Sequence, residues 1–179
     1  MSDEFEERKR RGLPRRRRAS STAGQVHVVG LISDTHGLVR PEVHTALAGV
    51  ESILHAGDVG GDAILDELEL IAPVRAVYGN TDAPDDPRLV ERLELKIGGV
   101  TVHVSHGHEL GSPSPAKLFE AYSADVIVYG HTHKQMLVQA GDRWAVNPGA
   151  AGPRRFELQP SVARMTIRGR DVRIQIVEL

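Results

Sequence analysis

The chain has no cysteine among its 179 residues, which excludes a disulfide framework, a thiolate metal site and a cysteine nucleophile. Any metal would have to be bound by imidazole, carboxylate and amide groups. Aromatic residues are few, with three Phe, three Tyr and one Trp, so a core must consist mainly of Val, Leu, Ile and Ala. The hydrophobic content of 40% permits such a core, and the length suits one domain.

Long apolar runs are also missing. No stretch approaches the roughly 20 apolar residues of a membrane span. The N-terminus lacks the apolar middle region of a secretory signal. We therefore expect a cytoplasmic protein with no membrane span, and the sequence does not indicate an oligomeric state.

Positive charge is concentrated at the N-terminus. Residues 1–24 carry eight basic and four acidic side chains, so the chain's net charge of −2 leaves −6 on residues 25–179. High charge without apolar periodicity predicts a disordered basic tail over 1–24 and one domain over 25–179. The tail is interpreted as a solvated segment, as a weak tether to nucleic acid or an anionic membrane, or as sequence before a later start near Val26.

Five short polar clusters each follow an apolar run rich in Val and Ile, which is typical of a buried strand. The carboxyl ends of strands in an open α/β sheet lie along one rim, where ligands bind. We therefore expect the polar clusters to meet. They are Asp34-Thr35-His36, Gly57-Asp58, Gly79-Asn80-Thr81-Asp82, His106-Gly107-His108 and Gly130-His131-Thr132-His133.

The pattern between the clusters predicts the other elements. Helices are expected near 41–48, 61–71 and 115–122, from apolar spacing and from Pro41 at a helix start. Two prolines predict a loop over 83–87, and Gly98-Gly99 predicts a hairpin between 89–97 and 100–106. The chain is thus expected to begin as βαβ units and to end as an antiparallel sheet, with strands at 135–139, 143–147, 161–167 and 172–179.

The clusters supply candidate ligands for a metal centre. One zinc ion usually has three or four protein ligands, whereas seven suffice for two ions if one carboxylate bridges them. Nitrogen and oxygen ligands without sulfur favour Mn, with Ni, Fe, Zn or Co as alternatives. The seven candidates are Asp34, His36, Asp58, Asn80, His106, His131 and His133.

The ordered motifs D-x-H, G-D, G-N-x-D, H-G-H and G-H-x-H resemble those of the calcineurin-like metallophosphoesterase superfamily. The small size and the GNTD and HGH variants are similar to its compact bacterial and archaeal phosphodiesterase branch. The resemblance covers residue 26 to about residue 177. It implies an α/β fold, a four-layer αββα sandwich of two mixed β-sheets flanked by helices.

The resemblance also implies roles for individual residues. Asp34, His36, Asp58 and His133 would bind one metal, and Asp58, Asn80, His106 and His131 the other, with Asp58 bridging. A hydroxide between the two divalent metals would attack the phosphorus atom in line, and the Asn80 amide would donate to a phosphate oxygen. Asp58 and Asn80 are therefore expected to be catalytic as well as metal-binding.

One position departs from the family pattern. Many members have a histidine that protonates the leaving group where this chain has Thr81, which cannot do so near neutral pH. His108, two residues from His106, is our candidate acid. Arg154 is predicted to bind substrate phosphate, with Arg155 as a neighbouring candidate. His55 is interpreted either as support for the site or as a packed core residue.

The missing histidine disfavours phosphomonoesters with poor leaving groups and favours phosphodiesters. The sequence therefore predicts a metal-dependent phosphodiesterase acting on a small substrate. The alternative is a protein-binding scaffold with weak or no catalysis, because a eukaryotic retromer subunit has the same fold with an altered metal site. The complete ligand set favours the enzyme.

Overall fold

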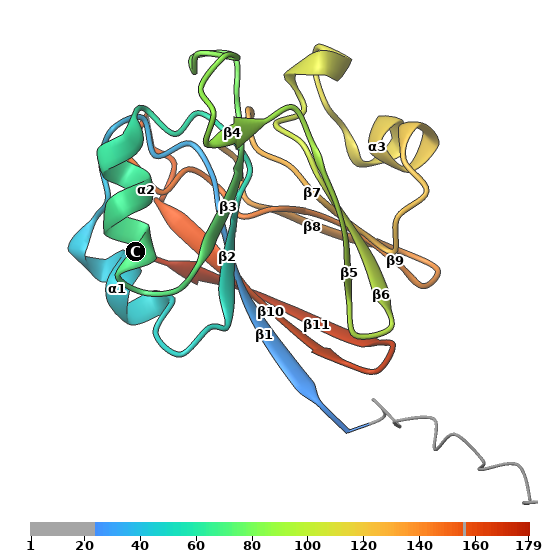
Figure 1. Cartoon of the computed structure of the whole chain (residues 1–179). Coiled ribbons are helices and arrows are strands. Elements are labelled where there is room, and N and C mark those ends of the chain that lie inside the picture. The colour runs from blue at the N-terminus through green and yellow to red at the C-terminus, as the bar shows by residue number, and fades with distance from the viewer. Residues whose placement is uncertain (1–23, 156) are drawn as a thin grey trace, which may run out of the picture.

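The chain folds into two β-sheets that pack face to face, with helices on both outer surfaces (Figure 1). This computed structural model describes residues 24–155 and 157–179. The predicted basic tail falls almost entirely outside the described residues. The four-layer αββα sandwich that the sequence predicts is confirmed.

The first sheet has six strands in the order β11-β10-β1-β2-β3-β4. Strands β1 to β4 run parallel, β10 pairs antiparallel with β1, and β11 pairs antiparallel with β10 at the edge. The apolar, mostly buried character of β1 to β3 fits parallel strands that are covered on both faces. Their bounds are Val26–Ile32 (β1), Ser52–His55 (β2), Val74–Val77 (β3), Leu89–Val90 (β4), Ser161–Arg168 (β10) and Asp171–Glu178 (β11).

The second sheet has five strands in the order β5-β6-β7-β9-β8. Strands β6, β7 and β9 are parallel, and β5 and β8 form the antiparallel edges. Their bounds are Leu93–Ile97 (β5), Val100–Val104 (β6), Val126–Val128 (β7), Met136–Ala140 (β8) and Arg143–Asn147 (β9).

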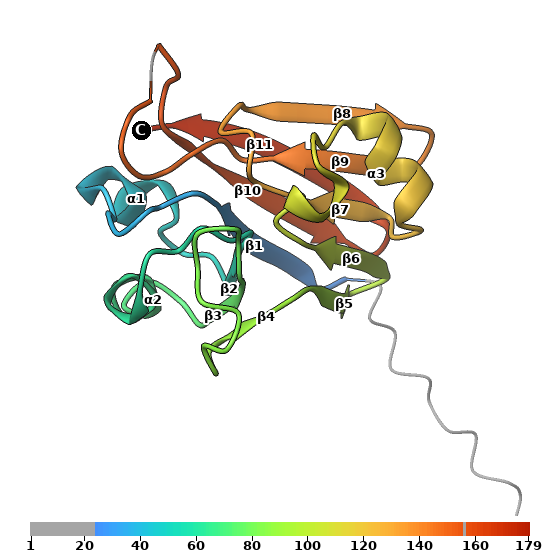
Figure 2. The ribbon, with the colours of Figure 1, turned by 90° about the horizontal axis from the view of Figure 1, so that it is seen from above.

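Three apolar clusters hold the layers together. Helices α1 (Pro41–Ala46) and α2 (Asp62–Glu69) cover the outer face of the first sheet, and α3 (Pro115–Ala121) covers the second sheet (Figure 2). The core that the two sheets share lies between them and consists mainly of Val, Ile, Leu and Ala. Among the described residues, no helix has the length and apolar character needed to span a membrane.

Two details of the predicted topology are wrong. The segment 89–97 is not one hairpin strand, because β4 pairs with β3 in the first sheet whereas β5 pairs with β6 in the second. The last third is not one antiparallel sheet either, since β8 and β9 join the second sheet and β10 and β11 join the first. Apolar spacing identifies strands but does not say which sheet a strand joins.

The parallel strands of both sheets end at the same end of the sandwich, which is the upper end in Figure 1. The loop after β2 touches the loop after β6, where His106 Nδ1 lies 2.7 Å from the Ala56 carbonyl oxygen. The five polar clusters therefore meet between two sheets, and not along the rim of one sheet as the sequence pattern suggested.

Candidate metal centre

The backbone of the site has an unusual conformation. Among the described residues, five that are not glycine have a positive φ, and each φ lies between 45° and 69°. This left-handed region is costly for residues with a Cβ atom, by about 1–3 kcal/mol each, and it persists where a site requires it. All five are predicted metal ligands: Asp34, His36, Asp58, His131 and His133.

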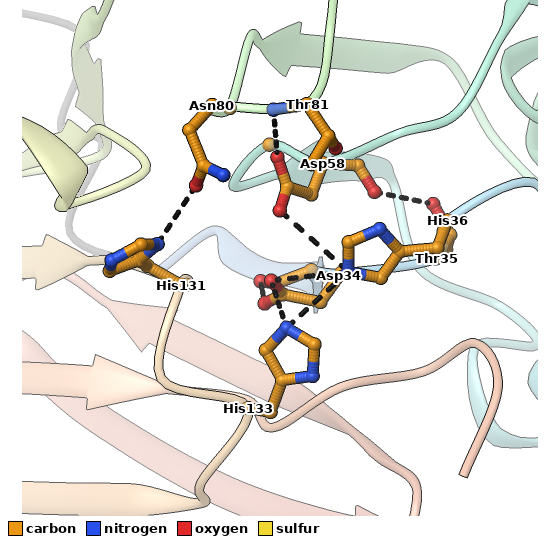
Figure 3. Close-up of polar contacts among 12 residues, drawn as sticks. Asp34, Thr35, His36, Asp58, Asn80, Thr81, His131 and His133 are labelled. Carbon is orange, nitrogen blue, oxygen red and sulfur yellow. Dashed lines mark hydrogen bonds and ion pairs between the residues drawn. The ribbon is translucent and has the colours of Figure 1, made fainter. Parts of the chain in front are cut away.

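A first cluster consists of Asp34, His36, Asp58 and His133, whose ligand atoms all lie within 4.8 Å of one another. His133 Nε2 is 3.2 Å from Asp34 Oδ1 and 3.3 Å from His36 Nε2. His36 Nε2 is 3.7 Å from Asp58 Oδ2 (Figure 3). Two carboxylates and two imidazoles thus point at one small volume, which suits a divalent transition metal.

A second cluster consists of Asp58, Asn80, His106 and His131. Asn80 Oδ1 lies 3.1 Å from His106 Nε2 and 2.9 Å from His131 Nδ1. His106 Nε2 is 3.4 Å from Asp58 Oδ2. The structure therefore brings all seven predicted ligands together in two clusters that share Asp58.

Asp58 is placed between the clusters by its two oxygens. Oδ1 accepts a hydrogen bond from the Thr81 backbone N–H at 2.9 Å, whereas Oδ2 faces the imidazoles of both clusters. Burial alone would raise the pKa of Asp58, but hydrogen bonds from His106 and Thr81 outweigh it and lower the pKa well below its usual range. The carboxylate is thus ionised and available between the two clusters.

Asp34 shows the same division between its oxygens. The Ser33 hydroxyl donates to Oδ2, whereas Oδ1 is buried, has no hydrogen-bond partner among the described residues and faces His133. A buried carboxylate oxygen without a partner is costly unless a cation approaches it. This unsatisfied oxygen and the donor set around it fit a divalent metal.

The imidazoles are oriented for metal binding. His106 Nδ1 donates to the Ala56 carbonyl at 2.7 Å, which directs Nε2 toward Asn80 and Asp58. Burial lowers the pKa of His36 and of His131 and favours their neutral, metal-binding form. Burial also acts to lower the pKa of His106, but its hydrogen bond with Asp58 and attraction to Asp34 outweigh this and raise it.

His55 supports the site from beneath. Its Nδ1 accepts from the Gly57 N–H at 3.2 Å, so Nε2 carries the proton and donates to Thr35 Oγ1 at 2.9 Å. Thr35 in turn donates to the Val59 carbonyl at 2.8 Å. Full burial lowers the pKa of His55 to about 4. The chain of hydrogen bonds connects the loop after β1 with the loop after β2, which favours the supporting role over simple packing.

Glycines at three positions allow the loops of the site to approach closely. A Cβ atom on Gly79 would collide with Asp58, and one on Gly130 would lie 2.8 Å from Asp34 Oδ2 and would overlap Ser33 Oγ. Both positions therefore exclude a side chain for a steric reason. Gly57 is similar, because a Cβ atom there would lie 2.7 Å from His106 Nδ1.

The remaining predicted site residues, His108, Arg154 and Arg155, lie outside the two clusters. The ring centroid of His108 lies 5.4 Å from that of His106 and 6.3 Å from that of His131, and its Nδ1 has no hydrogen-bond partner in the part of the chain that the structure describes. Arg154 lies on the surface with Nη2 3.9 Å from Glu157 Oε2, so its role in substrate binding stays a prediction. Arg155 is near enough to His36 to contribute to the lowering of its pKa, after the larger effect of burial.

Three further residues, which are not among the predicted ligands or catalytic residues, hold the site. Ser33 fixes Asp34, as described above. Asn147, at the end of β9, donates to the Gly130 carbonyl at 2.8 Å and to Thr132 Oγ1 at 3.1 Å. Asp82 accepts three backbone hydrogen bonds. Their positions after strand ends are the signal in the sequence, but nothing in it specifies their partners.

The geometry and the ordered motifs agree with a comparison against known families. A family model described as the calcineurin-like phosphoesterase superfamily domain matches residues 28–170. The chain belongs to the calcineurin-like phosphoesterase superfamily. Membership implies divalent metal cofactors and supports phosphoesterase activity.

Curated relatives in this superfamily are archaeal and bacterial. A protein of Methanothermobacter thermautotrophicus named a probable metallophosphoesterase is 35% identical over 84% of this chain and 91% of its own. A phosphodiesterase of Methanocaldococcus jannaschii is 27% identical over 68% of this chain and 82% of its own. The solved structure of vacuolar protein sorting 29 from Cryptosporidium parvum has a TM-score of 0.73 at 22% identity, over 86% of this chain and 98% of its own. This last likeness shows the fold alone.

Proposed function

We propose that this calcineurin-like phosphoesterase is a phosphodiesterase that uses two divalent transition metals, of which Mn²⁺ is the first candidate. The observation that carries the proposal is the position of Asp58 Oδ2, 3.7 Å from His36 Nε2 and 3.4 Å from His106 Nε2, between the two clusters. The archaeal phosphodiesterase relative supports the reaction class.

The first cluster would hold one ion and the second cluster the other, with Asp58 shared. When bound, the two metals supply an activated water near neutral pH and neutralise charge that develops on the phosphoryl oxygens. The Asn80 side chain would also donate its amide hydrogens to a phosphate oxygen, since its Oδ1 faces His106 and His131.

The proton for the leaving group is assigned to His108. Its side chain is about one-third exposed, so a substrate can reach it from solvent, and it lies beside His106 and His131. A diester of nitrophenol needs no acid, whereas an alkyl leaving group does. His108→Gln should therefore slow hydrolysis of an alkyl diester about 100-fold or more and change nitrophenyl diester hydrolysis little. Equal slowing of both substrates would contradict the assignment.

The first experiment measures activity after metal removal. The stripped protein is assayed with a chromogenic phosphodiester and its monoester after addition of Mn, Ni, Zn, Co or Mg. Transition metals should restore diester hydrolysis and give little monoester hydrolysis. If two ions bind per chain without any turnover, the scaffold function replaces the enzyme.

The shared carboxylate provides a second test. Asp58→Asn should lower diester kcat/KM by on the order of 100-fold or more and reduce the number of ions bound. Asp142→Asn removes an equal charge at an exposed turn residue and should leave activity near that of the unchanged chain. Full activity of Asp58→Asn in buffer replete with metal would exclude a bridging role.

A further inference from the structure

The loops that carry the two clusters are joined in two different ways. The loop after β1 and the loop after β2 are connected by three backbone hydrogen bonds, from Asp34, His36 and Gly37 N–H to the carbonyls of Gly57, Asp58 and Val59, each at 3.0 Å. These bonds use no side chain. The relative position of Asp34, His36 and Asp58 in the first cluster is therefore set mainly by the backbone, with the Thr35 hydroxyl adding a bond to the Val59 carbonyl.

The loop after β3 is joined to the loop after β2 by carboxylates instead. The β2–β3 ladder ends at the pair His55 and Ala76. Beyond it, within the part of the chain that the structure describes, the hydrogen bonds between loops 57–60 and 79–82 all end on Asp58 or Asp82. Asn80, the ligand from this loop, is thus positioned against Asp58 by side-chain oxygens.

Asp82 makes most of these contacts. Its Oδ2 accepts from Val59 N–H at 3.0 Å and from Gly79 N–H at 2.9 Å, and its Oδ1 accepts from Gly60 N–H at 3.0 Å. Val59 directly follows Asp58, and Gly79 directly precedes Asn80. One carboxylate therefore fixes the backbone next to a ligand on each side of the second cluster.

We infer that Asp82 is a positioning residue for the second metal, acting through Asn80 and Asp58 without contacting either ion. This inference rests on the proposed two-metal function. Asp82→Asn keeps the size of the side chain but replaces one acceptor oxygen with an NH₂ group facing backbone N–H groups. The attachment of the loop after β3 is then weakened to the Thr81 N–H bond with Asp58 and the bonds to the remaining Asn oxygen, whereas the backbone hydrogen bonds of the first cluster stay intact.

The test measures Mn²⁺ affinity in two single-site backgrounds by calorimetry. His133→Ala leaves the second cluster, and Asn80→Ala leaves the first. Adding Asp82→Asn should weaken Mn²⁺ binding about 10- to 100-fold in the His133→Ala background and less than about threefold in the Asn80→Ala background. Asp85→Asn is the matched control, because it removes an equal charge from an exposed residue of the same loop region.

Equal losses in both backgrounds, or no loss in either, would overturn the inference. Circular dichroism of each variant establishes that it is folded, and Asp82→Glu, which retains both acceptor oxygens, should recover part of the lost affinity. In the otherwise unchanged chain, Asp82→Asn should leave one tight ion and one weakened ion. If the unchanged chain binds fewer than two ions, the proposed function fails, and that result is distinct from failure of the role of Asp82.

Discussion

At the scale of single residues, each carboxylate of the site has one oxygen fixed by the protein and one left for a cation. Ser33 fixes Asp34 Oδ2 and the Thr81 N–H fixes Asp58 Oδ1. The fixed oxygen sets the direction of the free one, so metal affinity depends on residues that would not touch a metal.

Gly130 should affect metal affinity as strongly as a ligand does, because it leaves space for the Ser33 hydroxyl that fixes Asp34. In Gly130→Ala the new methyl group would overlap Ser33 Oγ and approach Asp34 Oδ2 to 2.8 Å and the Ala56 carbonyl to 2.9 Å. We expect Mn²⁺ binding to weaken at least about tenfold, measured by calorimetric titration. Gly24→Ala is the control, since a Cβ there meets no atom of the other described residues within 4 Å. Equal affinity of the two variants would show that the 130–133 loop can shift without cost.

His55 should make stability depend on pH. Its pKa is about 4 in the folded chain against 6.5 when exposed, so the unfolded chain binds the extra proton between these values. The contribution of neutral His55 to the free energy of unfolding is therefore fully present above pH 6.5 and is lost as the pH falls toward 4. About 2 kcal/mol should be lost by pH 5.

The measurement compares urea unfolding at pH 7.5 and pH 5 for the unchanged chain and for His55→Asn, whose oxygen can still accept from Gly57 N–H. The variant is expected to be less stable at pH 7.5 but to lose less free energy of unfolding between the two pH values. The same pH dependence in both proteins would show that His55 titrates normally.

The ligands could be identified from sequence because each follows an apolar strand and belongs to an ordered motif. The contacts of Ser33, Asp82 and Asn147 could not be predicted in this way, although Asp82 ends the G-N-x-D motif. Asp82 and Asn147 act mainly through hydrogen bonds to backbone groups distant in the sequence, and Ser33 acts through its hydroxyl group on the carboxylate of the neighbouring Asp34. Single polar residues near strand ends are common, and only the folded loops reveal which backbone group each one meets.

At the scale of elements, α3 depends on one buried side chain. Leu118 is the buried residue of α3 and packs in the apolar cluster beneath it with Ile127, Tyr129 and Ala145, whereas Phe119 packs against this cluster only partly buried. Leu118→Ala should lower the free energy of unfolding by about 3 kcal/mol, measured by urea denaturation. Exposed Glu120 on the same helix is the control, and Glu120→Ala should change it by less than about 0.5 kcal/mol. Similar values for both variants would mean that α3 contributes little to the folded state.

The bounds of most elements agree with the sequence pattern, but the strand predicted over 89–97 divides at Glu91 and Arg92. The chain there leaves the first sheet after β4 and enters the second at β5. Leu89 and Val90 are both apolar and 93–97 alternates apolar and charged residues, with only two charged residues between the two parts, so the sequence does not mark a break. The change of sheet depends on which edge is free in the folded molecule, and a local pattern contains no such information.

At the scale of the whole molecule, the site connects the two sheets. Loops after β1, β2 and β3 come from the first sheet, and loops after β6 and β7 come from the second. Asp58, in the loop after β2 of the first sheet, lies against His106, in the loop after β6 of the second sheet. A metal that binds ligands from both loops would therefore cross-link the sandwich, and metal binding should stabilise the entire fold.

Metal removal should accordingly lower the unfolding temperature. An ion present at a free concentration 100 times its dissociation constant raises the free energy of unfolding by about 2.7 kcal/mol, so two such ions raise it by about 5 kcal/mol. For a domain of this size the shift is on the order of 10 °C. Calorimetric scans with Mn²⁺ and with a chelator measure the difference.

Asp58→Asn serves as the control for this shift. Loss of the shared ligand should remove most of the Mn²⁺-dependent stabilisation, so any change in unfolding temperature that the chelator still causes in this variant does not come from the two metal ions. The stabilisation should also increase with the logarithm of free Mn²⁺, as linkage requires. If the unfolding temperature were unchanged by Mn²⁺ although ions bind, the ions would bind the unfolded chain equally well, and the cross-link between the sheets would contribute nothing to the fold.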